Sequence, residues 1–309
     1  MNEKISIIIC TYNRDKYIYR SLELIAENHF PKDEYEIVLI NNKSTDNTEN
    51  ECFRFQSNFP EVPFRYFVEQ QQGLSYARNR GIAEATGDIL VFLDDDSFVK
   101  SNYLSNLKAN IAKYSDCMAF GGKILPLYES GKEPEWMCKW LFSLVSAIDL
   151  GDNVQLFEGK RYPIGANMGF RRECIEKCGN FNVKLGRSAK NLIGGEEKDL
   201  FERISQKNLT VYYFPDVEVE HVIPPSRTTL DYIKRVGLGI GISENLRCNA
   251  ISKGKYLKRL LLECVKWGGS LIIWLQYMLQ GKRVAANTII IFRWFVTKGL
   301  LKRQSPESI

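Results

Sequence analysis

The sequence predicts an α/β fold in which a mixed, mainly parallel sheet is flanked by helices and followed by a helical C-terminal extension. Short apolar runs alternate with helical patterns through the first third of the chain, which is typical of strand–helix–strand units in a parallel sheet. From about residue 228 onward the pattern is helical. With 309 residues, the chain is long enough for one large or two medium domains with a substantial core.

Four apolar runs in the first third predict buried strands, at residues 5–10, 35–40, 64–68 and 88–93. Continuous β-branched runs such as ISIIIC fill parallel strands that are covered on both faces. The spacing of Tyr17, Ile18, Leu22 and Ile25 predicts a helix with one buried stripe. Residues 73–86 predict a second helix, which ends at Gly87.

Polar clusters follow three of these strands, at the point where each strand ends. They are Thr11–Arg14, Asn41–Asp46 and Asp94–Ser97. Ligands of parallel α/β sheets bind outside the carboxyl ends of the strands. We therefore expect the three clusters to converge in one crevice.

Asp94, Asp95 and Asp96 directly follow the apolar run 88–93. Three adjacent carboxylates in a partly buried crevice repel one another unless a cation lies nearby or water solvates them. Mg²⁺ or Mn²⁺ is the natural occupant, since carboxylate and phosphate oxygens suit hard cations. A solvated acidic turn is the alternative, and the buried strand before the aspartates favours the metal site.

The section from about 100 to 230 is less regular than the first third. It predicts a helix over residues 196–206 and a strand over 210–214, and Pro224-Pro225 marks a boundary. The sequence therefore divides into a sheet domain over residues 1–227 and a helical extension over 228–309.

The helical extension is basic, whereas the rest of the chain is acidic. The net charge of the whole chain is +5, but residues 245–305 carry twelve Lys or Arg and one acid, Glu263, so this segment has a charge of +11 and the remainder −6. Its two uncharged runs, residues 267–281 and 284–292, are shorter than the roughly 20 apolar residues that span a membrane. Basic residues around such runs favour helices lying on an anionic membrane surface. Packing on the rest of the chain or at a dimer contact is the alternative.

The eight cysteines form no CxxC pair, and the first apolar run is too short for a secretory signal. We expect reduced thiols and a cytoplasmic protein, placed peripherally on the inner face of the cytoplasmic membrane by the basic extension. Nucleic acid is a second anionic partner in principle, but no recognised binding motif supports it, so we expect none.

The chain resembles the family 2 glycosyltransferases, which have the GT-A fold. The resemblance is carried by ISIIICTYNR, EIVLINNKSTDNT, GLSYARNRGIAEATGDILVFLDDDSFV, GANMGFRR, GGEEKDLFERI and VEVEH. These segments cover about residues 5–225, and their order and spacing are more specific than any one of them. The resemblance implies a Rossmann-like GT-A catalytic domain that binds a nucleotide-sugar.

The resemblance also implies roles for the residues at the first two strand ends. Thr11, Asn13 and Arg14 match the family's first nucleotide-contacting loop. Asn41 stands where the family usually has an aspartate that accepts a hydrogen bond from uracil. The side-chain oxygen of an asparagine also accepts, so a UDP-sugar is expected and a different base stays open. Asn42 continues this loop, with simple turn chemistry as its alternative role.

Further matches give the metal and phosphate residues. Arg78 lies in the family's ARN element, which implies contact with phosphate or ribose; an ion pair across the sheet is the alternative. Asp94 and Asp96 fit the DxD motif, so that Asp94 holds ribose or sugar hydroxyls and Asp96 ligates Mn²⁺ or Mg²⁺, with Asp95 shared between the tasks. His221 closes VEVEH, where a histidine can complete the metal shell, although a lone histidine is more often structural.

A second acidic motif, Gly194-Gly195-Glu196-Glu197, matches the place of the family's catalytic base. A carboxylate there takes the proton of the acceptor hydroxyl as it attacks the anomeric carbon, which inverts the configuration. The resemblance assigns this role to Glu197, with Glu196 as the second choice. Ordinary first-turn helix electrostatics is the alternative. Asn167 and Arg171, in GANMGFRR, are implied to lie near the acceptor or donor sugar.

The sequence therefore predicts an inverting, metal-dependent glycosyltransferase that acts on a saccharide or a polyprenyl-linked acceptor in polysaccharide or glycan synthesis. A metal-dependent nucleotidyltransferase is a competing hypothesis, but it normally has a glycine-rich phosphate loop after the first strand, and CTYNRDKY has no glycine. A non-catalytic, membrane-associated nucleotide-sugar-binding protein is the third hypothesis.

Overall fold

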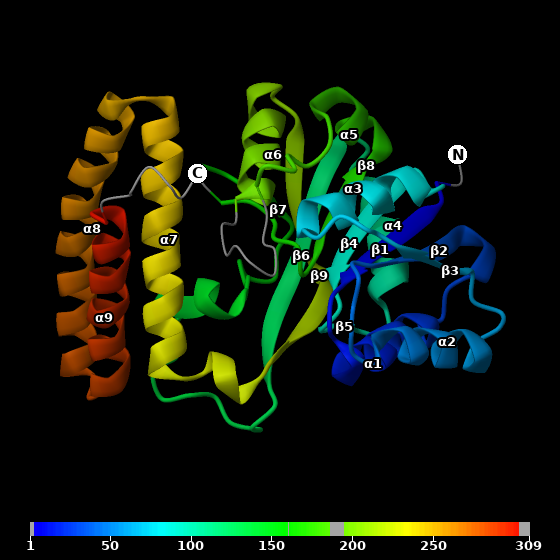
Figure 1. The fold of residues 1–309 in the computed structure, drawn as a ribbon, viewed down its shortest axis with the longest axis horizontal. Coiled ribbons are helices and arrows are strands. Elements are labelled where there is room, and N and C mark those ends of the chain that lie inside the picture. The colour runs from blue at the N-terminus through cyan, green and yellow to red at the C-terminus, as the bar shows by residue number, and fades with distance from the viewer. Residues whose placement is uncertain (1–2, 160, 186–194, 303–309) are drawn as a thin grey trace. The chain divides into compact units, whose positions relative to one another are not determined.

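A computed structural model describes residues 3–159, 161–185 and 195–302 of the chain (Figure 1). It confirms the predicted α/β class. A mixed sheet in the order β3-β2-β1-β4-β8-β6-β9-β5 forms its centre, and β7 pairs with β9 at one side. The predicted helical C-terminal extension is also present, as the helices α7, α8 and α9.

The parallel part of the sheet comes from the first third of the chain. Its strands are β1 (Ile5–Thr11), β2 (Tyr35–Asn41), β3 (Phe64–Val68) and β4 (Ile89–Asp94). β1 pairs in parallel with both β2 and β4, and β3 pairs in parallel with β2. In this register Thr11 lies opposite Asn41, and Cys10 lies opposite Asp94. The carboxyl ends of three strands therefore meet at one edge, as the sequence predicted.

The remaining strands complete the sheet in mainly antiparallel pairs. They are β5 (Ser97–Val99), β6 (Cys117–Tyr128), β7 (Gln155–Leu156), β8 (Met168–Arg171) and β9 (Thr210–Ile223). β8 pairs antiparallel with β4 and with β6, and β9 pairs antiparallel with β5 and β7. β9 extends well beyond the predicted strand 210–214, because the chain continues in extended form through Pro215.

Helices cover both faces of the sheet. They are α1 (Asp15–Ala26), α2 (Thr48–Asn58), α3 (Leu74–Glu84), α4 (Tyr103–Lys113), α5 (Arg172–Cys178) and α6 (Glu196–Gln206). Ile7 and Ile9 of β1 pack in one core with α1, α2 and α4, whereas Ile8 packs in a second core with α3, α5 and α6. Alternate side chains of β1 therefore point to opposite faces of the sheet and pack against different helices. Figure 1 shows these helices as ribbons around the sheet.

By its internal contacts the chain divides into two compact units. The first, called the sheet unit, comprises residues 1–127 and 146–222; the second, called the helical unit, comprises residues 128–145 and 223–309. The sequence placed a single boundary after residue 227 and did not indicate that 128–145 belongs with the C-terminal helices. Every described residue predicted for the functional site lies in the sheet unit.

The helical unit consists of three long helices and two short 3₁₀ segments. They are η2 (Lys139–Val145), η3 (Pro225–Arg227), α7 (Leu230–Ile251), α8 (Lys253–Leu279) and α9 (Arg283–Leu300). α9 packs against both α7 and α8. Among the described residues, no helix has the length and apolarity that crossing a membrane demands. The short 3₁₀ segment η1 (Lys32–Glu34) belongs to the sheet unit, before β2.

Candidate active site

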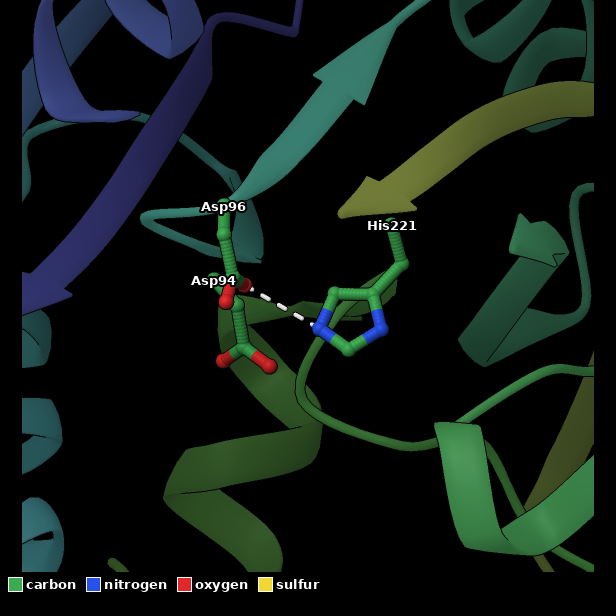
Figure 2. Close-up of side chains that lie close together, drawn as sticks. All are labelled: Asp94, Asp96 and His221. Atoms are coloured by element: carbon green, nitrogen blue, oxygen red, sulfur yellow. Dashed lines mark ion pairs between the residues drawn. The ribbon is translucent and has the colours of Figure 1, made fainter. Parts of the chain in front are cut away.

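Two carboxylates that follow β4 meet a histidine from β9. Asp94, Asp96 and His221 each offer one ligand atom, and these atoms all lie within 4.8 Å of one another. Figure 2 shows Asp94 and Asp96 next to the imidazole ring, whose Nε2 lies 3.1 Å from Asp96 Oδ1. Carboxylate oxygens suit Mg²⁺ and Mn²⁺, and a neutral imidazole is a common metal ligand. We call this group the Asp–His cluster, and its donor set fits the divalent cation that the sequence predicts.

The pairing of β5 with β9 brings the histidine to the aspartates. Ser97 lies opposite His221 in this antiparallel pair. The backbone N–H of Val222 also donates to the carbonyl oxygen of Asp96 at 2.9 Å. The turn between β4 and β5 is thereby fixed on both sides, so the ligand atoms are positioned by regular secondary structure rather than by a free loop.

Asp95 is buried between its two neighbours and Arg14. Burial raises the pKa of Asp95 to about 7, and the charge of Asp96 adds to this effect, whereas Arg14 opposes it. Arg14 Nε lies 3.4 Å from Asp95 Oδ1, and Arg14 Nη2 lies 3.6 Å from Asp96 Oδ2. Two carboxylates therefore lie at these distances from one guanidinium group, and the charge of Asp94 also acts on Arg14. This excess of negative charge favours a further cation at the same place.

Two more carboxylates begin α6, and an arginine from α3 joins them. Arg78 Nη1 donates to Glu196 Oε1 at 3.0 Å, and Arg78 Nη2 donates to Glu197 Oε1 at 2.8 Å. The guanidinium group also lies 5.2 Å from the centre of the Phe181 ring. Arg78 is buried, so its charge is compensated by the two glutamates rather than by water. This ion pair joins α3 and α6, which share one core, so it differs from the ion pair across the sheet given as the alternative, and contact of Arg78 with phosphate or ribose stays a prediction.

The two glutamates are held differently. Glu196 uses both oxygens, since its Oε2 accepts from the backbone N–H of Gly195 at 3.0 Å. Among the described residues, both hydrogen bonds to Glu197 end on Oε1, the second coming from the backbone N–H of Gly165 at 2.9 Å. The side chain of Glu197 is 20% exposed, against 6% for Glu196. Glu197 therefore has an oxygen atom to offer to a substrate, and Glu196 is engaged at both oxygens.

Gly165 is a position where a side chain does not fit. A Cβ atom there would lie 2.0 Å from Arg78 Nη2 and 2.7 Å from Glu197 Oε1. The close approach of the backbone lets its N–H reach the carboxylate. Gly165 opens the segment GANMGFRR, and its contact with Glu197 was not predicted from the sequence.

The acid pair and the Asp–His cluster influence each other electrostatically. Burial raises the pKa of Glu197, Arg78 lowers it, and the charges of Glu196 and Asp94 raise it further. Burial likewise raises the pKa of Cys10, at the end of β1, to about 12, and both Arg78 and Asp94 act on this thiol. The two clusters therefore lie around the same carboxyl edge of the sheet. A raised pKa makes a carboxylate a stronger base near neutral pH.

The predicted nucleotide loop is tied together by its own side chains. Asn41 Oδ1 accepts from the backbone N–H of Ser44 at 2.8 Å, while Asn41 Nδ2 donates to Tyr66 Oη at 2.7 Å. The N–H of Ser44 fixes which end of the amide is the oxygen. Since each oxygen accepts two hydrogen bonds, Asn41 keeps one acceptor position for a ligand. Tyr66, in β3, was not predicted as part of this loop.

Asn42 and Asn13 also bond to protein groups. Asn42 Nδ2 donates to the carbonyl oxygen of Gln71 at 2.7 Å, and its Oδ1 accepts from the N–H of Gly73 at 2.8 Å. Asn13 has a φ of 55° and accepts from the N–H of Thr45 at 2.7 Å. Both residues hold neighbouring loops in place; the bonds of Asn42 reach Gln71 and Gly73, so they are not the local turn chemistry offered as its alternative. Thr11, also predicted here, is buried at the end of β1.

Two residues implied to lie near a sugar make hydrogen bonds to other protein groups. Asn167 is fully buried, where it accepts from Tyr103 Oη at 2.8 Å and donates to the carbonyl oxygen of Val217 at 2.8 Å. It precedes Met168, which pairs with Phe92 near the carboxyl end of β4, so its implied place stays a prediction. Arg171 lies opposite Ile89, at the amino end of β4, so it is at the edge of the sheet remote from Asp94 and its implied place is wrong. Gly194 of the second acidic motif lies outside the described residues.

Comparison with known proteins identifies the family. The sequence model described as glycosyl transferase family 2 matches residues 6–179, which is more than half of the chain. The chain belongs to glycosyl transferase family 2. It is 25% identical over 270 residues to the glucosyl-dolichyl phosphate glucuronosyltransferase of Haloferax volcanii, with 84% of this chain and 83% of the relative covered.

Solved structures of glycosyltransferases share the fold of this family 2 member. A mannosyltransferase from Pyrobaculum calidifontis, in complex with GDP-Man and Mn²⁺, matches with a TM-score of 0.60 at 18% identity, covering 98% of this chain and 88% of its own. TarS 1–349 of S. aureus, in complex with UDP, matches with a TM-score of 0.53 at 17% identity, covering 96% and 90%. The GT-A type of fold implied by the sequence is thereby confirmed.

Proposed function

We propose that the chain transfers a sugar from a nucleoside diphosphate donor to a hydroxyl group of an acceptor, with inversion at the anomeric carbon. The proposal is carried by the geometry of Glu197. Arg78 and the N–H of Gly165 fix its Oε1, and the Asp–His cluster lies within electrostatic reach. No observation favours a nucleotidyltransferase or a non-catalytic binding protein.

In this proposal Glu197 is the general base. It accepts the proton of the acceptor hydroxyl while the acceptor oxygen forms a bond to the anomeric carbon. The bond between that carbon and the diphosphate oxygen breaks at the same time, so the diphosphate leaves with the electron pair. Attack from the face opposite the leaving group inverts the configuration. Arg78 keeps Glu197 ionised against the effect of its burial, because the guanidinium group lowers the pKa.

The leaving diphosphate is assigned to the aspartates and Arg14. Asp94, Asp96 and His221 would hold Mn²⁺ or Mg²⁺, which supplies Lewis-acid stabilisation of the diphosphate oxygens when bound. Arg14 is 30% exposed and lies beside Asp95 and Asp96, so its guanidinium group can turn toward phosphate oxygens. We add Asp94 to the predicted metal ligands Asp96 and His221, because its carboxylate lies within 4.8 Å of their ligand atoms.

For the donor we propose a UDP-sugar, bound over the loop that contains Asn41. The remaining acceptor position of Asn41 Oδ1 suits the ring N–H of uracil. The likeness to a UDP complex of TarS supports this choice, while the GDP-Man complex of the archaeal mannosyltransferase makes guanosine the competing base.

For the acceptor we propose a saccharide or a saccharide linked to a polyprenyl lipid, in the synthesis of a surface polysaccharide or glycan. The relative from Haloferax volcanii is named for a dolichyl phosphate substrate and aligns over most of both chains. A lipid-linked acceptor is confined to a membrane. We therefore place the enzyme in the cytoplasm, peripherally at the inner face of the cytoplasmic membrane.

The donor experiment uses the full chain with Mn²⁺ and a panel of UDP-, GDP- and TDP-sugars. We expect one nucleotide class to raise the melting temperature and to be hydrolysed slowly, with the nucleoside diphosphate as product. Mg²⁺ is compared in the same assay. If no nucleotide-sugar stabilises the protein or is hydrolysed with either ion, the proposed function fails.

A further inference from the structure

The helix α8 exposes a continuous apolar face. Its six most prominent side chains are between 53% and 82% exposed: Leu257, Leu261, Val265, Ile272, Leu275 and Leu279. At 3.6 residues per turn these positions fall within an arc of about 80° and extend over about 33 Å of helix. Single exposed leucines are ordinary on a protein surface, but a row of this length marks an interaction surface.

The opposite face of α8 is well packed inside the helical unit. Glu263 is buried and accepts from Arg259 Nη1 at 2.6 Å and from Arg293 Nη1 of α9 at 3.2 Å. Trp267 Nε1 donates to Thr297 Oγ1 of α9 at 3.0 Å. This packing fixes the rotation of α8 about its axis. The apolar face is therefore presented outward by the structure of the unit and does not result from a helix that lacks a partner.

The charges around the apolar face have one sign. Lys253 and Lys258 are exposed, and at 3.6 residues per turn they lie within about 40° of the two edges of the row. From Lys253 to Lys302 the single acidic residue is Glu263, whose charge is buried and compensated by two arginines. The surface of α8 thus combines aliphatic side chains with uncompensated lysines, which is the composition of helices that lie in the interface of an anionic membrane.

We propose that the apolar face of α8 docks on the surface of an anionic lipid bilayer, with the helix parallel to the membrane plane. The aliphatic row enters the boundary between headgroups and acyl chains, and the lysines contact the anionic headgroups. A second copy of the chain fits less well. Two such faces in contact would bring lysines together, because α8 exposes no acid to pair with them.

The proposed function places the enzyme at the membrane but names no residues for the contact, and the apolar face of α8 supplies them. Membrane docking does not depend on glycosyl transfer, because binding to lipid is measured without donor, metal or acceptor. The donor assay described above needs no lipid. A failure of either proposal can therefore be told apart from a failure of the other.

The test is flotation of the full chain with vesicles of phosphatidylcholine alone, or of phosphatidylcholine and phosphatidylglycerol at about three to one. We expect the chain to float with the anionic vesicles and to dissociate as salt is raised to about 1 M, where the Debye length falls to about 3 Å. The variant Leu261→Asp with Leu275→Asp should bind at least about 100-fold more weakly, since each leucine that leaves the acyl boundary costs about tenfold.

Matched variants in the sheet unit control for the added charge. Leu127→Asp with Leu156→Asp changes two leucines of the sheet unit, 37% and 41% exposed, and should bind vesicles as the unmodified chain does. Lys253→Gln with Lys258→Gln should weaken binding by about fivefold for each lysine, whereas Lys113→Gln with Lys207→Gln should not. Circular dichroism confirms that each variant is folded.

Three outcomes overturn the proposal. The first is a folded full chain that floats with neither kind of vesicle. The second is equal binding by the α8 variants and their controls, which would place the contact elsewhere. The third is a stable dimer in analytical ultracentrifugation that Leu261→Asp with Leu275→Asp dissociates, together with absent flotation, because the face would then belong to a second copy of the chain.

Discussion

The substitution Glu197→Gln tests the proposed base with little change in shape. In the present chain the N–H of Gly165 donates to Glu197 Oε1 at 2.9 Å, and Arg78 donates to the same oxygen. A glutamine keeps an oxygen that can accept both hydrogen bonds. It cannot accept a proton at neutral pH. A positioned general base contributes about 10²–10⁴-fold to the rate, which corresponds to about 3–5 kcal/mol of activation free energy. We expect the rate of transfer to fall by this factor.

The same structure predicts that the fold of the variant is not weakened. The pKa of Glu197 is raised, mainly by burial, so the folded state disfavours its charged form. Above its unfolded pKa, an acid with a raised pKa reduces stability, and a neutral glutamine removes this effect. The substitution also weakens one charge-assisted hydrogen bond from Arg78, which costs about 1 kcal/mol, but Arg78 keeps Glu196 at 3.0 Å. The melting temperature should therefore stay within a few degrees.

The assay follows sugar transfer under saturating donor, together with donor affinity and thermal melting. Glu196→Gln is the comparator, because Glu196 is engaged at both oxygens and should lose less than about tenfold in rate. Three results together support the base: slow transfer by Glu197→Gln, unchanged donor affinity, and a folded protein. Near-normal transfer by Glu197→Gln refutes the reasoning, and a larger loss in Glu196→Gln reassigns the base.

Three further predictions concern the same site. Asp96→Ala removes a metal ligand that lies 3.1 Å from His221, so Mn²⁺ affinity in calorimetry should fall by at least about tenfold, or about 1.4 kcal/mol, and unchanged affinity would place the metal elsewhere. Gly165→Ala forces a Cβ to within 2.7 Å of Glu197 Oε1 and should reduce transfer and stability, whereas Gly239→Ala, with nothing within 4 Å of its added Cβ, should reduce neither. Because the base acts when deprotonated and its pKa is raised, transfer should fall on the acid side at a pH above the ordinary glutamate value of about 4.3, and an acid limb at or below that value contradicts the assignment.

The parallel part of the fold was predictable because three of its four strands, β1, β2 and β4, are buried almost throughout. The runs at 5–10, 35–40, 64–68 and 88–93 are mainly apolar, and each became a strand with at most one residue of difference at either end. The helix α2 was not predicted. It buries little more than Thr48, Cys52 and Phe55, and it follows directly on a polar loop, so its apolar stripe is too thin to stand out in the sequence.

The site was predictable in its residue types and less so in its contacts. The aspartates after β4 are visible because a buried strand leads into them. The approach of His221 depends on the pairing of β5 with β9, and the bond between Arg78 and the two glutamates joins α3 to α6. Neither contact leaves a local pattern, since each joins segments more than a hundred residues apart. The family resemblance, rather than hydrophobic periodicity, pointed to these residues as candidates for the site.

The two groups of carboxylates differ in where their positive charge comes from. Glu196 and Glu197 share Arg78, whose nitrogen atoms lie 3.0 and 2.8 Å from their oxygens, so the chain itself compensates this pair. Asp95 and Asp96 lie 3.4 and 3.6 Å from Arg14, and the charge of Asp94 acts on the same guanidinium group. A metal ion gains most from the second group, because the first already contains its cation. A base must also remain free of a metal to accept a proton. The placement of the two arginines therefore agrees with the proposed metal site and the proposed base, and exchanging those proposed roles would require moving a buried guanidinium group.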